Sequence, residues 1–513
     1  MGRLTCRWAA ELEAKRMTEP TVDTTVGRVS GTRQAGVDVF RGIPYARPPI
    51  GELRFRPPVA PEPWSGVKTA TTFGPLALQS ASPLEGMLGS TAIVTDEATC
   101  LSLNVWTPAT DGGRRPVMVW IHGGAFLTGS GSTPWYDGAR FAANHDVVVV
   151  TINYRLGAFG FLFLDDLASD GAGSTANAGI LDQVAALRWV ADNIAGFGGD
   201  PGNVTIFGES AGGMSVGTLL ALPAARGLFH RAVLQSGACH NALTRDEATK
   251  MAHELLAAVG VSETDLSGLR TADPAAILDA QAKLSATYVS QGMPFQPVQD
   301  GTVLPDLPIR LLQAGEAADV DVMVGTNLDE WKLFSALDPR FSDLDRAGLV
   351  TAVRGALPGV DAEALVDAYR QNRPGASAPD LLGAITTDRV FRVPAIRVAE
   401  ARADQGRPAY MYLFTWSTPA FGGRLGSCHA LEIPFVFDNL HQPGVPFLCG
   451  DQPPQSLATG MNAAWASFAR TGSPAPDWPT YQTDSRSTMV LDAEWRLEAD
   501  PDGAERKVWE GLL

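Results

Sequence analysis

The sequence lacks long apolar runs and is poor in basic residues, and both shortages exclude classes of protein. Apolar stretches such as Val147–Ile152 are far shorter than the roughly 20 residues that a membrane-spanning helix needs. Lysine and arginine number 40 against 56 aspartate and glutamate residues, so the formal net charge is −16 at pH 7. A chain this acidic is not expected to bind nucleic acid or an anionic membrane surface.

Cysteines are also scarce. The five are widely spaced and odd in number, at positions Cys6, Cys100, Cys239, Cys428 and Cys449. Their spacing matches no common metal site, and a disulfide framework is not typical of a chain of this size. We therefore expect reduced, mostly buried thiols, no metal and no organic cofactor.

The N-terminal 20 residues mix charges throughout and contain no apolar segment of a secretory signal. We expect residues 1–20 to be a disordered extension, with translation starting at either Met1 or Met17, and we expect a cytoplasmic protein.

The rest of the chain predicts an α/β fold. Strands are expected at 101–106, 116–121, 146–152, 204–207, 232–235 and 320–325. They alternate with helical segments such as Gly179–Ile194, whose apolar residues recur at helical spacing. This alternation indicates a mostly parallel central sheet flanked by helices. Alanine-rich stretches around 245–285 and 345–405 read as helical insertions packed over the sheet, which leaves 21–513 as a single domain.

The stretch VTIFGESAGG, Val204–Gly213, carries the first candidate for chemistry. Its β-prone start runs directly into Ser210, and an apolar, helix-like segment follows. A serine between a strand and a helix is typical of a nucleophile elbow, in which flanking glycines let the two elements approach. The Gly-x-Ser-x-Gly pattern recurs around Ser215. That serine would lie one turn inside the helix, its hydroxyl bonded to a backbone carbonyl, so Ser210 is the predicted nucleophile.

A serine nucleophile needs a base, and the base needs an orienting acid. Only seven histidines are available. His429 fits best, because in α/β-hydrolases the order is nucleophile, acid, histidine. His240 is a weaker candidate near the same edge of the sheet. His122 opens HGGAF, a loop whose backbone N–H groups can face an oxyanion, and is expected to shape that loop. For the acid, Asp329 and Glu330 are neighbours after a predicted strand, and the residues alone do not separate them.

Taken together, several motifs resemble the type-B carboxylesterase/cholinesterase family of the α/β-hydrolase fold, over about residues 22–510. They are VFRGIPYARPPIGELRF at 39–55, CLSLNVWTP at 100–108, WIHGGAFLTGS at 120–130, NYRLGAFGFL at 153–162, NAGILDQVAALRWV at 177–190, FGGDPGNVTIFGESAGG at 197–213, LQSG at 234–237, GTNLDEW at 325–331 and CHALEIPFVF at 428–437. The HGGAF form is similar to that of bacterial esterases of the para-nitrobenzyl esterase kind.

The resemblance implies a serine carboxylesterase that acts on small-molecule esters through an acyl-enzyme, with large helical insertions over its active site. The implied site consists of the nucleophile Ser210, the acid Glu330, the base His429 and the oxyanion-hole N–H groups of Gly124, Ala125 and Ala211. The resemblance also implies a structural salt bridge between Arg155 and Asp182.

The chain departs from the family pattern before the cysteine of CLSLNVWTP. The family usually has Ser-Glu-Asp there, but this chain has Glu97-Ala98-Thr99, so the acid that pairs with Arg54 is expected to be displaced or missing. Cys100 also lacks the upstream cysteine that extracellular members bond to it, which favours an intracellular protein.

Alternative functions remain at this stage. The same triad could hydrolyse an amide, a carbamate or a specialised natural-product ester, and the family also contains non-catalytic adhesion proteins on the same fold. The stretch from Ser65 to Thr99 holds no tryptophan, which counts against the choline-binding indole of acetylcholinesterases. The natural substrate, the stereoselectivity and the oligomeric state are left open.

Overall fold

An 11-stranded sheet forms the centre of the computed structural model, in the order β14-β13-β12-β11-β10-β9-β7-β8-β6-β4-β3. The structure describes residues 19–82, 86, 89, 94–167, 176–264, 266–288, 292–336 and 338–512. The strands are β3 (Thr32–Gln34), β4 (Val37–Pro44), β6 (Ser102–Thr107), β7 (Arg115–Ile121), β8 (Val148–Ile152), β9 (Gly199–Glu209), β10 (Arg231–Gln235), β11 (Asp321–Asn327), β12 (Ala409–Phe414), β13 (Ser487–Leu491) and β14 (Arg496–Ala499).

The middle of this sheet is parallel, as the sequence predicted. Strands β8, β7, β9, β10, β11, β12 and β13 pair in parallel with their neighbours. Antiparallel pairs lie at both margins. A separate three-stranded sheet consists of β1 (Thr21–Thr24), β2 (Gly27–Ser30) and β5 (Val67–Thr69).

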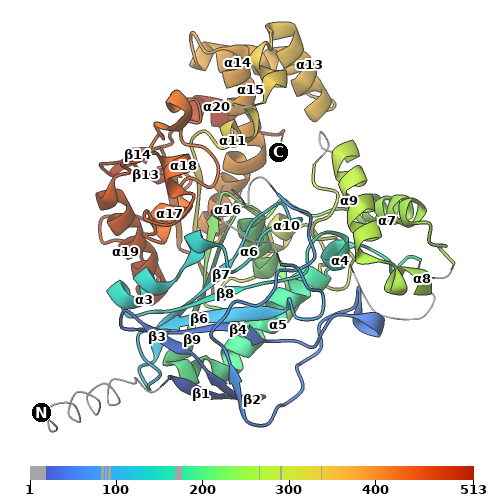
Figure 1. Ribbon diagram of the computed structural model, residues 1–513. Coiled ribbons are helices and arrows are strands. Elements are labelled where there is room, and N and C mark those ends of the chain that lie inside the picture. Colours follow the sequence, from blue (N-terminus) through green and yellow to red (C-terminus); the bar gives the residue numbers. More distant parts are fainter. Residues whose placement is uncertain are drawn as a thin grey trace, which may run out of the picture.

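The described helices lie partly on the two faces of the large sheet and partly beyond it (Figure 1). They are α3 (Ala139–His145), α4 (Gly157–Phe161), α5 (Ala178–Asn193), α6 (Ala211–Ala221), α7 (Arg245–Val259), α8 (Ser267–Thr271), α9 (Pro274–Tyr288), α10 (Pro308–Gln313), α11 (Lys332–Ser335), α12 (Pro339–Ser342), α13 (Arg346–Ala356), α14 (Ala362–Asn372), α15 (Ala378–Thr387), α16 (Val393–Asp404), α17 (Ile433–Val436), α18 (Val445–Cys449), α19 (Gln455–Thr471) and α20 (Gly503–Val508). None of the helices within the described ranges is long and apolar enough to cross a membrane.

The alternation of side chains along β7 explains why its buried stretch Val117–Ile121 is continuously apolar. Val117, Val119 and Ile121 belong to the core on one face of the sheet. Met118 and Trp120 belong to the core on the other face. Successive side chains of a strand point to opposite faces, so a strand covered on both sides must be hydrophobic at every position. This is why such strands were recognisable as continuous apolar runs.

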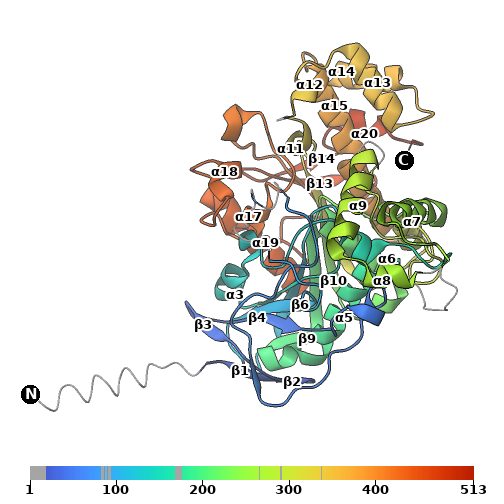
Figure 2. The same cartoon turned by 45° about the vertical axis from the view of Figure 1, so that its right-hand side comes forward.

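The two predicted insertions are helical, but the second one does not pack over the sheet throughout. Within this insertion, α16 packs on β11 and β12, and the turn just before it, Asp388–Arg392, also contacts β11. Helices α13, α14, α15 and α20 instead share an apolar cluster that includes Leu349, Val366 and Trp509, and they lie together at one end of the molecule (Figure 2). Each of these amphipathic helices buries its apolar stripe against the others. Residues 1–18 of the predicted N-terminal extension lie outside the described residues, and the single-domain division stays a prediction.

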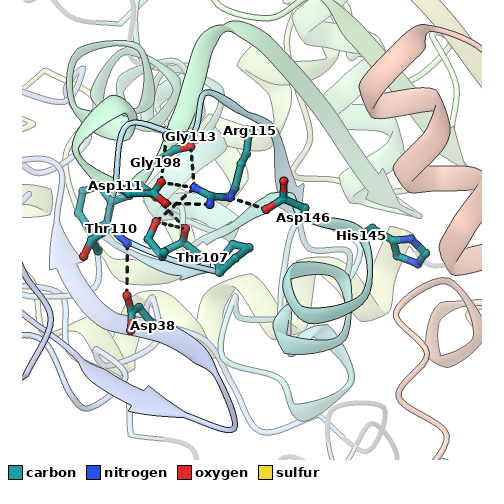
Figure 3. Close-up of polar contacts among 12 residues, drawn as sticks. Asp38, Thr107, Thr110, Asp111, Gly113, Arg115, His145, Asp146 and Gly198 are labelled. Carbon is teal, nitrogen blue, oxygen red and sulfur yellow. Dashed lines mark hydrogen bonds and ion pairs between the residues drawn. The ribbon is translucent and has the colours of Figure 1, made fainter. Parts of the chain in front are cut away.

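A polar network around Arg115 fixes the start of β7 (Figure 3). The start of β7 pairs with the start of β9, so this network lies at the far end of the strands from the end of β9. Arg115 Nε donates to Asp146 at 2.6 Å, and its Nη1 donates to Asp111 at 2.5 Å. Nearby, the Thr107 hydroxyl donates to the carbonyl of Phe197 at 2.7 Å. These bonds tie the strand to the surrounding loops.

Two buried arginines have carboxylate partners. Arg155 Nε and Nη2 donate to Asp182 at 2.8 and 2.7 Å, with both side chains almost fully buried. Arg54 Nε and Nη2 donate to Glu97 at 2.7 and 2.5 Å. Removing one partner of such a pair leaves an uncompensated buried charge. The acid that the sequence left as displaced or missing is therefore displaced, and it is Glu97.

Candidate active site

Ser210 lies at a sharp turn between β9 and α6. Its φ of 57° and ψ of −125° place a non-glycine residue in a sparsely populated region of backbone space. A Cβ on Gly208 would lie 2.6 Å from the carbonyl oxygen of Ile121, and a Cβ on Gly212 would overlap that same oxygen. The glycines therefore let helix and strand meet, as the sequence analysis expected. This is the strand–turn–helix geometry of a nucleophile elbow.

The second serine of the repeated pattern lies elsewhere. Ser215 is fully buried inside α6, and its Oγ accepts a hydrogen bond from Gln183 Nε2 at 3.0 Å. The sequence analysis expected a backbone carbonyl as its partner. That expectation was wrong, because the neighbouring helix α5 brings a side-chain amide into reach.

His429 and Glu330 form a buried pair. His429 Nδ1 lies 2.6 Å from Glu330 Oε2, and the other oxygen of Glu330 accepts the N–H of Asn327 at 2.7 Å. Glu330 follows β11, and His429 precedes α17.

The neighbouring carboxylate makes different contacts. Asp329 accepts the N–H of Ser427 at 3.0 Å and pairs with Lys332 Nζ at 3.0 Å. The geometry thus separates two acids that the residues alone left open and of which the family resemblance implied Glu330, because of the two only Glu330 is hydrogen-bonded to His429.

A second carboxylate at His429 was missed by the sequence analysis. Glu209 Oε1 lies 3.0 Å from His429 Nε2, the ring nitrogen opposite the one that Glu330 contacts. Glu209 is buried at the end of β9, and a buried carboxylate requires a partner. The sequence carried only a weak signal for this position: a glutamate two residues after the predicted strand Val204–Phe207.

A third glutamate completes this buried group. Glu432 Oε1 accepts from Gln235 Nε2 at 3.1 Å, and its Oε2 accepts from Asn327 Nδ2 at 2.7 Å. Trp465 Nε1 in turn donates to Gln235 Oε1 at 3.0 Å. These bonds hold Glu432 in place and link it to the loop of Glu330 through Asn327.

The carboxylates control the protonation of His429. Burial lowers the pKa of His429, but attraction to Glu209 and Glu330 raises it more, and the resulting pKa is about 9. Burial raises the pKa of Glu209 to about 8, against the opposing effect of His429. Because the two groups are in contact, they titrate as one coupled unit. The imidazolium form of His429 is strongly stabilised in this site.

The loop after β7 carries free backbone donors. Gly124 and Ala125 have φ values of 107° and 55°, and the N–H groups of Leu127 and Thr128 both donate to the carbonyl of Gly124. Within the described chain, the N–H groups of Gly124, Ala125 and Ala211 have no hydrogen-bond acceptor. Unpaired N–H groups of this kind can stabilise an oxyanion.

The other candidate histidines take structural positions. The ring of His122 stacks on Tyr154 with 4.5 Å between centroids. Its Nδ1 lies 2.8 Å from the carbonyl oxygen of Gly123, and burial lowers its pKa to about 4. His122 thus shapes its loop, as expected. Burial also lowers the pKa of His240 to about 4, and no hydrogen bond among the described residues links it to Ser210 or Glu330.

A serine elbow, a buried Glu–His pair and a loop with free N–H groups, carried on a mostly parallel sheet, define an α/β-hydrolase. The family model described as the carboxylesterase family matches residues 18–509. The chain belongs to this family and is a carboxylic ester hydrolase, which removes the non-catalytic binding protein as an alternative.

Individual relatives match over nearly the whole chain. Para-nitrobenzyl esterase of Bacillus subtilis (strain 168) is 39% identical, over 96% of this chain and 98% of its own length. Liver carboxylesterase of Sus scrofa is 37% identical, over 96% and 93%. Among solved structures, the crystal structure of Geobacillus stearothermophilus carboxylesterase EST55 at pH 6.2 matches this chain with a TM-score of 0.87 and 44% sequence identity. The match covers 95% of this chain and 99% of that one. A structure of PNB esterase has a TM-score of 0.85 and 38% identity, covering 97% and 100%.

The described residues contain no group of three or more histidine, cysteine, aspartate or glutamate side chains that could hold a metal ion. The expectation that the enzyme needs no metal or organic cofactor stays a prediction.

Proposed function

We propose that this enzyme hydrolyses small-molecule carboxylic esters by a serine mechanism in which Ser210 is the nucleophile, His429 the base and Glu330 the orienting acid. One observation carries the proposal: His429 presents Nδ1 to Glu330 at 2.6 Å and Nε2 to Glu209, the residue directly before Ser210. The nitrogen that would accept the serine proton is thereby directed at the elbow. The hydrogen bond between a catalytic serine and its base often tightens only when substrate is bound.

The chemistry follows from these positions. Ser210 Oγ attacks the ester carbonyl carbon while His429 Nε2 takes its proton, and the carbonyl oxygen becomes an oxyanion that accepts from Gly124, Ala125 and Ala211. Collapse of this intermediate transfers the proton to the leaving alcohol and leaves an acyl-enzyme on Ser210. Water then attacks the acyl carbon while His429 takes its proton. The bond from the acyl carbon to Ser210 Oγ breaks, His429 returns the proton to Ser210, and the carboxylic acid is released.

An organophosphate reagent tests the assignment, because its phosphorus forms a stable adduct that resembles the tetrahedral intermediate. We expect one label per chain, on the peptide that contains FGESAGG, and loss of para-nitrophenyl ester hydrolysis in parallel. Peptide mapping by mass spectrometry locates the adduct. Stoichiometric inactivation with the label on another residue would contradict the proposal.

Glu209 is expected to set the pH dependence. In Glu209→Gln the ring loses one negative neighbour, so the pKa of His429 falls and the imidazole is neutral at lower pH. The acid limb of kcat/KM, expected in the wild type above the ~6.5 of an isolated histidine, should therefore move to lower pH. The plateau should fall about 10-fold, because the imidazolium of the transition state loses an attraction.

The profile is measured as kcat/KM between about pH 5 and pH 10. The matched control is Glu62→Gln, because the Glu62 side chain is largely exposed and, among the described residues, forms an ion pair with Arg47 alone. An acid limb that stays in place or moves to higher pH in Glu209→Gln would show that Glu209 does not act on His429.

We further propose that the enzyme works in a reducing compartment such as the cytoplasm. Cys100, Cys239, Cys428 and Cys449 are free and buried, as the sequence analysis expected of the thiols. Unpaired thiols are typical of proteins in compartments where disulfides do not persist.

A further inference from the structure

One widened helical turn lies against the base of the acid–base pair, and the residue just before this turn contacts the loop that carries the acid. Residues Asp388–Arg392 form a π-helix between α15 and α16. Pro394, in the first turn of α16, has no N–H and cannot donate to the carbonyl of Val390 four residues earlier. This lost bond explains the wider turn. Such turns inside helices are frequent at functional sites.

The turn contacts the base directly. The ring centroids of Phe391 and His429 are 4.9 Å apart, with an interplanar angle of 40°. Phe391 is itself buried in the main core, so it forms a fixed wall against the imidazole.

The residue just before the turn contacts the loop of the acid. Thr387 Oγ1 accepts the backbone N–H of Trp331 at 3.0 Å, and Trp331 directly follows Glu330 in the chain. Thr387 is buried, so this hydroxyl is the partner that satisfies a partly buried backbone donor. Thr387 thus holds the loop that carries the acid, and Phe391 contacts the base.

A buried polar chain anchors the turn between these two contacts. The Tyr369 hydroxyl, on α14, donates to Asp388 Oδ2. Trp509 Nε1 donates to the same hydroxyl at 2.7 Å. Arg392, at the far end of the turn, pairs with Asp502 at 2.9 Å. The turn is therefore held from α14 and from the C-terminal segment around α20, which pack together at one end of the molecule (Figures 1 and 2).

We propose that Asp388 is a positioning residue: by anchoring the turn to Tyr369, it fixes Thr387 and Phe391 and thereby the relative placement of Glu330 and His429. This inference rests on the proposed catalytic roles of those two residues. A purely structural role would instead join α13–α15 to the rest of the fold, and its loss would lower stability without a specific loss of turnover.

The test uses small changes in the full-length enzyme. Tyr369→Phe removes only the hydroxyl that holds Asp388, and Thr387→Val removes only the acceptor for Trp331. Both variants are expected to lower kcat for a para-nitrophenyl ester about 10-fold with little change in KM, because small misplacements of catalytic groups slow the chemical step. Thr387→Ser restores the acceptor and should return kcat to within about twofold of the wild type.

Two controls separate positioning from stability. Thr107→Val removes the buried hydrogen bond from the Thr107 hydroxyl to the carbonyl of Phe197, near the start of β7 and away from the elbow (Figure 3). Val350→Ala weakens the α13–α15 cluster without removing a polar contact of the turn. Both should lower Tm and leave kcat within about twofold.

The proposal is overturned if Tyr369→Phe and Thr387→Val lower Tm like the controls and keep wild-type kcat. That outcome leaves the catalytic assignment intact as long as Ser210→Ala is inactive. An active Ser210→Ala would instead overturn the proposed function itself, so the two failures are distinguishable.

Discussion

Replacement of Ser210 by alanine is expected to lower kcat for ester hydrolysis by roughly 10⁶, since a serine nucleophile within a triad accounts for about that much. The variant should fold, because Ser210 makes no side-chain capping bond to α6, and alanine keeps the Cβ that already tolerates the turn. Steady-state turnover of a para-nitrophenyl ester and the Tm of the purified variant check both statements.

Ser215→Ala is the matched control. It removes a hydroxyl from the same helix and the second copy of the same motif, but that hydroxyl accepts a bond from Gln183 in the core. We expect some loss of stability, because the amide of Gln183 is left without its partner, and most of the activity should remain. If Ser215→Ala were folded but inactive and Ser210→Ala were active, the assignment of the nucleophile to Ser210 would be wrong.

The second large effect is expected from Glu330→Gln. Glu330 accepts from His429 Nδ1, so it selects the tautomer whose Nε2 can take the serine proton, and its charge stabilises the imidazolium. A glutamine can hold the ring in the wrong tautomer and carries no charge. The expected fall in kcat is about 10⁴, the size of effect known for an equivalent carboxylate-to-amide change in a serine protease.

Asp329→Asn provides the comparison at the adjacent residue. Asp329 contacts Lys332 and the N–H of Ser427 rather than His429, so its loss should reduce turnover only mildly. The two variants are compared by kcat at a pH on the plateau of the wild-type profile. If Asp329→Asn were the crippled enzyme and Glu330→Gln the active one, the acid would be misassigned by one residue.

The fold was predictable wherever local pattern and burial agree. The buried stretches Val117–Ile121 of β7 and Val148–Val150 of β8 are continuously apolar because both faces of the sheet are covered. The elbow is marked by a strand, a serine and glycines within ten residues. The packing of α13–α15 was not predictable in the same way. An amphipathic stripe shows that a helix buries one face, but not whether the partner is the sheet or another helix.

The candidate site shows the same limit at the level of single side chains. Asp329 and Glu330 differ by one position in a loop, and only the tertiary structure directs one of them at His429. Glu209 was missed because the two variable positions of a Gly-x-Ser-x-Gly motif accept many residue types. A glutamate at one of them therefore carries little local information. The carboxylate that pairs with Arg54 is Glu97, at a different position from the acid in the family motif. Comparison with the motif shows only that the usual acid is missing.

The glycines at the elbow also affect how the motif is inherited. A Cβ at Gly208 or Gly212 would meet backbone atoms of β7, and a compensating mutation in a neighbouring side chain cannot remove a backbone atom. Descendants that keep this sheet must keep both glycines, whether or not they keep catalysis. Ser210 is under no such constraint and can be lost freely once the chemistry is no longer selected. In a lineage of such proteins, the glycines therefore record the architecture, whereas the proposed catalytic residues, Ser210 among them, record whether the chemistry is still in use.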